Sequence, residues 1–301
     1  MGLLRRATRR VIGNVDTPVV PLTDQQVASA QLRLAIAGDV GHPSAELEVT
    51  VAAMAAEHAR RPFDALVLLG DNIYPDGDPE RAGEAVLEPL APILERGVGL
   101  VAVLGNHDVD RGRGDEVASR LGMPGRWYER RFGPVQLIAL DSTRAADREQ
   151  QAWLDRTLTD SDAAFRVVAL HHPPYSAGWH GSSRDARRAF GRAFVRHDVD
   201  LVLAGHEHDY QRSKSIDGTV YVVSGAATHL RATGRRRFTA AAHARHHFLD
   251  LWVIDEQVVV QPVGHDRQPF DQARLPTRDA RGAADAPARR PTPASARRAS
   301  L

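Results

Sequence analysis

The sequence predicts an α/β fold in which a parallel or mixed β-sheet is covered on both faces by helices. Short, continuous apolar runs alternate with segments of helical periodicity, and this alternation is typical of strand–helix–strand units. No repeat of the solenoid type is found along the chain. With 301 residues and 43% hydrophobic content, the chain is long enough to bury one sizeable core or two small ones.

The expected elements follow one another in strand–helix order. The first strand covers residues 32–39, and a helix over 44–61 follows it with Ser44 as its N-cap. Asp147 caps a later helix in the same way. Further strands are expected at 64–71, 98–106, 133–142, 165–172, 199–206 and 218–225, further helices at 79–95 and 147–159, and a terminal hairpin at 248–263.

The composition divides the chain into three parts. Residues 1–30 are weakly periodic and are expected to form an N-terminal arm, whereas residues 31–270 form the folded domain. Residues 271–301 are rich in Arg, Ala and Pro and cannot bury a core, so we expect a disordered tail. A solubilising role for this tail is favoured over binding to an anionic partner.

Charge and cysteine content exclude several classes of function. The formal net charge of +1 gives no reason to expect nucleic acid as a stable partner or binding to a membrane surface. The absence of cysteine excludes disulfides, thiolate nucleophiles and zinc–thiolate sites. No apolar run reaches the roughly 18 residues of a membrane span, and the basic start lacks the apolar segment of a signal peptide. A cytoplasmic location is therefore expected.

Five of the expected strands end in side chains that can bind a metal ion. These residues are Asp39 in GDVG, Asp71 and Tyr74 in GDNIY, Asn106 with His107 in GNHD, His171 in LHHPPYS, and His206 and His208 in GHEHDY. A single "GD" after a strand is common turn chemistry, but all five motifs occur in order. Ligands bind at the carboxyl ends of the strands in open α/β sheets, so a site is predicted at that edge.

The types of ligand indicate the chemistry. Carboxylate, amide, phenol and imidazole ligands suit Fe, Mn and Zn better than Ca. The set is too large for one ion with an open position, and it suits two ions about 3.5–4 Å apart that share a carboxylate. Such a pair clamps a phosphoryl group and lowers the pKa of a bound water, so that a metal-bound hydroxide can attack phosphorus in line.

This ordered set of motifs resembles the signature of the calcineurin-like metallophosphoesterases, over about residues 32–225. Two details resemble the purple acid phosphatase branch, in particular its tartrate-resistant type. The GDVG block lacks a His two residues after Asp39, and Tyr74 stands three residues after Asp71, where that branch has its tyrosinate. The resemblance implies a four-layer α/β sandwich of mixed central β-sheets flanked by helices, with the metal site at the carboxyl ends of the strands.

The resemblance also implies a division of the ligands between two metal ions. The first ion would be bound by Asp39, Asp71, Tyr74 and His208, and the second by Asp71, Asn106, His171 and His206. Asp71 would bridge the two ions. Fe(III) with a divalent Fe, Zn or Mn is favoured because a phenolate stabilises Fe(III), and a pair of Mn ions stays open.

Two histidines are expected to act on the substrate. His107 would lie beside the phosphate as a hydrogen-bond donor or general acid. His180 stands nine residues after His171, where the tartrate-resistant type has a second histidine on the substrate side. It is therefore a candidate acid for the leaving group.

The expected function is acid phosphatase-like hydrolysis of a small phosphorylated substrate, a phosphomonoester, by a binuclear metal-dependent phosphoesterase. Hydrolysis of phosphodiesters or nucleotides at the same site is the alternative. A non-catalytic scaffold that binds metal or phosphoprotein is disfavoured because every expected ligand is present. The natural substrate, pH optimum and oligomeric state stay open.

Other polar residues near these motifs have more ordinary interpretations. His172 is not expected to bind metal because adjacent strand side chains point to opposite faces. Asn72 is expected to cap its loop. Asp108 either orients His107 or braces the loop. The basic segment 229–247 either holds an anionic substrate near the mouth of the site or is a solvated loop.

Overall fold

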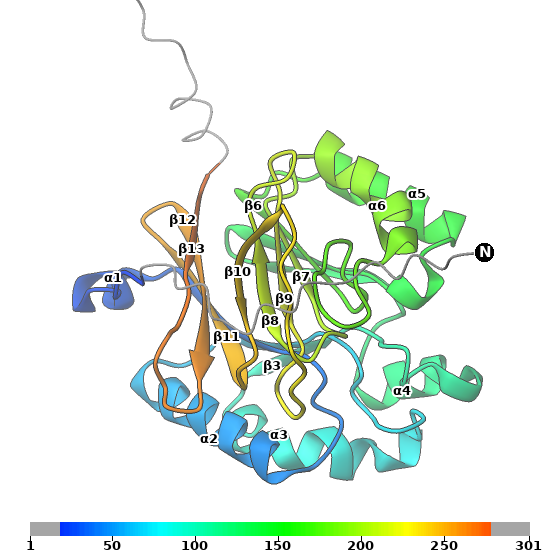
Figure 1. Cartoon of the computed structure of the whole chain (residues 1–301), viewed down its shortest axis with the longest axis horizontal. Helices are drawn as coiled ribbons and strands as arrows, with labels where there is room; N and C mark the ends of the chain where they lie inside the picture. The colour runs from blue at the N-terminus through cyan, green and yellow to red at the C-terminus, as the bar shows by residue number, and fades with distance from the viewer. Residues whose placement is uncertain (1–18, 278–301) are drawn as a thin grey trace, which may run out of the picture.

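Two mixed β-sheets lie at the centre of the structure, a computed structural model that describes residues 19–277 (Figure 1). The first sheet has the order β13-β12-β11-β1-β2-β3 and the second β10-β8-β9-β7-β6-β5-β4. The strands of the first sheet are β1 (Leu32–Ala37), β2 (Ala65–Leu68), β3 (Gly99–Ala102), β11 (His247–Ile254), β12 (Gln257–Gly264) and β13 (Ala273–Pro276). Those of the second are β4 (Tyr128–Phe132), β5 (Val135–Ala139), β6 (Phe165–Leu170), β7 (Leu201–Ala204), β8 (Tyr210–Ser213), β9 (Val220–Ser224) and β10 (Thr239–His243).

Helices cover both outer sides of the paired sheets, as Figure 1 shows. The α-helices are α1 (Asp24–Ser29), α2 (Ala45–Arg60), α3 (Glu88–Leu94), α4 (Gly114–Arg120), α5 (Arg148–Thr159) and α6 (Arg184–Arg196). None of the helices within residues 19–277 is both long and apolar enough to span a membrane.

The side chains of the second sheet alternate between two apolar cores. Leu137 and Val167 point inward into the main core, which they share with residues of the first sheet. Their neighbours Ile138 and Val168 belong to a second cluster that includes Phe190 of α6. This alternation is the period of two that a strand imposes on its side chains, and it confirms the predicted four-layer α/β sandwich.

Most predicted elements are present, and local chemistry explains their ends. The Ser44 side chain accepts the backbone N–H of Leu47 at the start of α2, and Asp147 caps α5, both as expected. The helix expected over 79–95 is instead broken into a 3-10 turn, a π-turn and the short α3. Pro89, in the first turn of α3, lacks the N–H that would continue a regular helix from the turns before it.

The boundary of the predicted tail needs a correction. Residues 273–276 form β13, which pairs with β12, so the expected disorder does not begin at residue 271. Ala273 is buried and Leu275 packs against the main core, which explains why this segment joins the sheet. The rest of the predicted tail, after residue 277, and the predicted arm before residue 19 lie outside the described residues.

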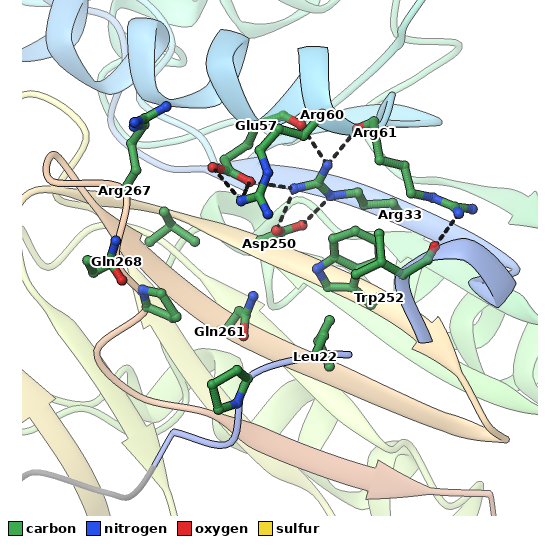
Figure 2. A pocket seen from close by; sticks show the side chains of 14 residues that line it. Leu22, Arg33, Glu57, Arg60, Arg61, Asp250, Trp252, Gln261, Arg267 and Gln268 are labelled. Atoms are coloured by element: carbon green, nitrogen blue, oxygen red, sulfur yellow. Dashed lines mark hydrogen bonds and ion pairs between the residues drawn. The ribbon is translucent and has the colours of Figure 1, made fainter. Parts of the chain in front are cut away.

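A buried arginine ties α2 to the first sheet. The guanidinium of Arg33, on β1, donates to both carboxylate oxygens of Asp250 on β11 and to the carbonyl oxygen of Glu57 on α2 (Figure 2). It lies between the rings of Phe63 and Trp252, at 4.3 and 4.1 Å from their centroids. Such a buried charge is tolerated because it is fully paired.

The topology brings several strand ends to one place. Strands β1, β2 and β3 are mutually parallel in the first sheet, and β5, β6, β7 and β9 are parallel in the second. The carboxyl ends of parallel strands lie at one edge of their sheet. The close contacts described below show that these two edges meet, and the predicted metal ligands lie where they do.

Candidate metal centre

The seven predicted metal ligands come from both sheets. Asp39, Asp71 and Asn106 follow β1, β2 and β3, respectively, so the first sheet delivers oxygen ligands. His171 directly follows β6, and His206 follows β7 in the second sheet. Tyr74 and His208 lie further along the loops that follow β2 and β7.

Three of these ligands have a left-handed backbone, which is uncommon for residues other than glycine. The φ angles are 59° at Asp39, 53° at Asp71 and 71° at His206. Such conformations cost about 1–3 kcal/mol each and are found where function requires a turn. The packing is also tight, since a Cβ atom on Gly105 would lie 2.1 Å from Oδ1 of Asp71.

The four ligands predicted for the first ion converge around the phenol of Tyr74. Its hydroxyl lies 3.1 Å from Oδ1 of Asp39 and 3.0 Å from Oδ2 of Asp71. Nε2 of His208 lies 3.4 Å from the same hydroxyl and 3.4 Å from Oδ1 of Asp39. One donor atom from each of the four side chains therefore faces a common point.

The four ligands predicted for the second ion converge in the same way around His171. Its Nε2 lies 3.4 Å from Oδ2 of Asp71, 3.1 Å from Oδ1 of Asn106 and 3.2 Å from Nδ1 of His206. The two sets share Oδ2 of Asp71, as a bridging ligand requires. The donor set therefore fits two ions.

Hydrogen bonds between the two sheets orient these ligands. Nδ1 of His171 lies 2.8 Å from the carbonyl oxygen of Leu69, which can only accept, so Nδ1 carries a proton and Nε2 is the nitrogen that faces the site. The backbone N–H of His206 donates to Oδ2 of Asp39 at 2.9 Å. Each contact joins a strand end of the second sheet to one of the first.

The electrostatics of the cluster also suit a cation. Burial, together with the charges of Asp39 and Asp71, raises the pKa of the Tyr74 hydroxyl far above its usual range. Burial alone would lower the pKa of His171, but the carboxylate of Asp71 raises it to about 9. Burial and the neighbouring His171 lower the pKa of His206 to about 2. The shifts of Tyr74 and His171 reflect two buried carboxylates whose charge a bound cation would neutralise, whereas that of His206 reflects burial and its histidine neighbours.

Asp108 braces the loops that carry two of the ligands. Its carboxylate accepts the backbone N–H groups of Asn72 and Ile73 on Oδ1, and that of Gly105 and the side-chain amide of Asn72 on Oδ2. All four distances are 2.8–2.9 Å. Of the two roles left open by the sequence, the structure supports bracing. Asn72 likewise holds its loop, since it also donates to the carbonyl oxygen of Val103.

The two predicted catalytic histidines both line the pocket above the ligands. Nδ1 of His107 is hydrogen-bonded to the carbonyl oxygen of Pro75, and Nε2 lies 4.0 Å from Oδ2 of Asp71. The ring of His180 lies 4.3 Å from that of His206, centroid to centroid. Both are therefore within the site, and their catalytic roles stay predictions.

His172 lies closer to the ligands than expected. Its Nδ1 is 3.0 Å from the hydroxyl of Ser142, and its ring is 4.7 Å from that of His206. Ligand atoms of His171, His172 and His206 lie close enough together to hold an ion. That His172 does not bind metal stays a prediction.

Sequence reasoning missed His229 as a residue of the site. This histidine lines the pocket, and its ring stacks on that of His208 at a centroid distance of 5.4 Å. Only residues 229–231 of the basic segment line the pocket, while residues 239–243 form β10. The abundance of histidine in the segment was the available signal, but nothing local indicates which histidine faces the site.

Comparison with known protein families and curated proteins identifies related sequences. The family model described as calcineurin-like phosphoesterase matches residues 32–210. A tartrate-resistant acid phosphatase type 5 from Oryctolagus cuniculus is 24% identical over 218 residues, which cover 61% of this chain and 67% of the relative. Purple acid phosphatase 3 from Arabidopsis thaliana is 26% identical over 232 residues, covering 64% of this chain and 62% of the relative.

Solved structures show the same fold. A purple acid phosphatase from yellow lupin superposes with a TM-score of 0.73 at 16% identity, covering 81% of this chain and 53% of the lupin chain. GAP50, the anchor in the inner membrane complex of Plasmodium, superposes with a TM-score of 0.71 at 16% identity, covering 82% of this chain and 89% of GAP50. At these identities, the likeness establishes the architecture alone.

Proposed function

Because this chain belongs to the calcineurin-like phosphoesterase family, we propose that it hydrolyses phosphomonoesters with a binuclear metal centre. One observation carries the proposal. Tyr74 and His171 each lie within 3.4 Å of Oδ2 of Asp71, and each is surrounded by the remaining ligands predicted for one ion. Two bound ions would supply a Lewis-acidic clamp for the phosphoryl group and an activated water.

The nature of the ligands supports the choice of metals. Tyr74, Asp39 and Asp71 would give one ion three oxygen ligands, which suit a hard ion such as Fe(III). His171, His206 and Asn106 would give the other ion a softer set, suited to Fe, Zn or Mn in the divalent state. A pair of Mn ions is the alternative.

The position of His107 in the lining of the pocket supports a role on the substrate. Since the carbonyl oxygen of Pro75 can only accept, Nδ1 of His107 carries the proton of that hydrogen bond and Nε2 faces the pocket. Nε2 is therefore the atom that would meet an oxygen of the phosphoryl group. The side chain of His180 also lines the pocket, next to His206, where it would meet the leaving group.

The activity can be tested with p-nitrophenyl phosphate. The purified protein should hydrolyse this monoester, lose the activity on treatment with a chelator and regain it when metal is restored. Bis-p-nitrophenyl phosphate distinguishes the alternative, a phosphodiesterase or nucleotide hydrolase, which would prefer the diester. Metal-replete protein without activity on any monoester or diester would overturn the proposal.

A non-catalytic scaffold is the candidate from another functional class, since one structural neighbour is described as an anchor. The convergence of all seven ligands and the presence of His107 in the pocket favour an enzyme. Replacing His107 with Ala separates the two. Binding functions should survive that change, whereas hydrolysis should not.

A further inference from the structure

A guanidinium group stands at the rim of the pocket with no carboxylate partner within residues 19–277. Arg231 lines the pocket, and its Nη1 lies 2.9 Å from Nε2 of His180. Apart from the ligand Asp71, no acidic residue of the described chain lines this pocket, whereas several imidazoles do. The charge of Arg231 is therefore available to an anionic ligand.

The backbone holds Arg231 in place over the candidate metal centre. The buried hydroxyl of Thr228 donates to the carbonyl oxygen of Asp39 at 2.7 Å, and the N–H of Arg231 donates to the carbonyl oxygen of His208 at 2.8 Å. Both acceptors belong to predicted metal ligands, so residues 228–231 are fixed to the site at both ends. By contrast, Arg235 in the same segment is exposed and does not line the pocket.

His180, whose side chain contacts Arg231, is fixed as well. The buried carboxylate of Glu207 accepts the backbone N–H groups of His180 and Gly181 at 3.2 and 2.6 Å, and it lies 3.5 Å from Nδ1 of His180. This arrangement directs Nδ1–H of His180 toward Glu207 and leaves Nε2 as the acceptor for the guanidinium. Arg231 is thereby held by a neutral partner that an anion can replace.

The contacts of His180 link Arg231 to the predicted metal ligands. His206 is a predicted ligand, the ring of His180 packs on it at 4.3 Å, and Arg231 follows on the next side chain outward. With His180 as the acid for the leaving group, Arg231 would lie on the leaving-group side of a phosphoryl group held at the ligands. Guanidinium binds carboxylates and phosphates through paired N–H donors.

Resting on the proposed phosphomonoesterase function, we propose that Arg231, next to His180, forms a subsite for a second anionic group on the leaving-group side of the substrate. The substrates favoured by this subsite are small phosphomonoesters whose alcohol carries a carboxylate or a second phosphate. Binding of that group would draw Nη1 of Arg231 away from Nε2 of His180.

Binding of phosphonates tests the subsite without any turnover. Isothermal titration calorimetry of the metal-loaded protein should show phosphonoacetate, which carries a carboxylate, binding about tenfold more tightly than methylphosphonate. Arg231→Gln should abolish most of this preference, and Arg231→Lys should retain part of it because the charge remains. Arg235→Gln is the matched control, and we expect it to keep the preference.

Hydrolysis then distinguishes the two kinds of second anion. Phosphoglycolate carries a carboxylate, ethylene glycol bisphosphate a second phosphate, and ethyl phosphate neither. The ratio of kcat/KM for the better of the first two to that for ethyl phosphate should fall about tenfold in Arg231→Gln. The probe with the larger fall identifies the anion that the subsite prefers.

These measurements distinguish a failure of the proposed subsite from a failure of the proposed phosphomonoesterase function. Equal binding of the two phosphonates, no measurable binding of either, or a preference that survives in Arg231→Gln would overturn the subsite, whatever the activity. An Arg231-dependent preference for phosphonoacetate in a protein that hydrolyses no phosphomonoester would support the subsite and overturn the proposed function.

Discussion

Replacing Asp108 removes the carboxylate that ties the loops of Asp71 and Asn106 together. The residue is fully buried and accepts four N–H groups, three from the backbone and one from Asn72. In Asp108→Ala all four donors lose their acceptor. At about 1 kcal/mol or more for each buried donor left unpaired, the variant should lose at least about 4 kcal/mol of its unfolding free energy. That is a large part of the roughly 5–15 kcal/mol of a typical domain.

Asp108→Asn is the gentler version of the same change. Its side chain keeps the shape but has one oxygen for two of the N–H groups and turns an NH₂ group toward the other two. Burial, followed by the charge of Asp71, raises the pKa of Asp108 to about 7, so the comparison is made at pH 8, where the carboxylate is ionised. We expect a loss of about 2–4 kcal/mol in urea unfolding, and a 10- to 100-fold weaker affinity for metal.

The matched control is Asp110→Asn, an exposed carboxylate two residues further along, which should change stability by less than about 0.5 kcal/mol. A loss below about 1 kcal/mol in Asp108→Asn, with the metal affinity unchanged, would refute the reasoning. The four hydrogen bonds would then contribute neither to stability nor to the arrangement of the ligands.

Three further predictions concern other residues. Iron-loaded protein should show a visible band from charge transfer between phenolate and Fe(III) that Tyr74→Phe abolishes; no such band in the wild type would contradict the assignment of Tyr74. His107→Ala should lower kcat by about 10²–10⁴ without changing the metal content, and an equal fall in metal content would contradict a role on the substrate. Burial lowers the pKa of His247 to about 4, from about 6.5 in an unfolded chain. The unfolded chain therefore binds the proton more readily, and the contribution of His247 is complete above about pH 6.5 and is lost as the pH falls toward 4, by about 3 kcal/mol in all. His247→Gln should remove this part of the pH dependence in urea unfolding, and an unchanged slope would show that another group causes it.

The ligands could be predicted from the sequence because each follows a short apolar run and a tight turn. Asp71 illustrates this. Five apolar residues and Gly70 precede it, and β2, the strand that it follows, runs parallel to β1. Such local patterns, taken together, place side chains at one edge of a sheet. The capping residues Ser44 and Asp147 were predictable for the same reason, because a cap acts on the next turn of its own helix.

Two features could not be predicted from the sequence, helix α6 and the position of residues 228–231. Helix α6 was not predicted although Ala186, Phe190 and Phe194 are buried at helical spacing, because its many arginines hide the apolar stripe. The position of residues 228–231 depends on the hydrogen bond from Thr228 to Asp39, which joins residues 189 positions apart. No local pattern signals a contact of this kind, so Arg231 could not be distinguished from the other arginines of its segment.

The most direct test of a binuclear phosphomonoesterase is the activity of metal-free protein as metal is added back. With p-nitrophenyl phosphate as substrate and a protein concentration well above the Kd for metal, hydrolysis should rise until two equivalents of metal per chain are bound and then stay constant. A plateau at one equivalent would contradict the shared role of Asp71, and two bound ions without hydrolysis would contradict the proposed reaction.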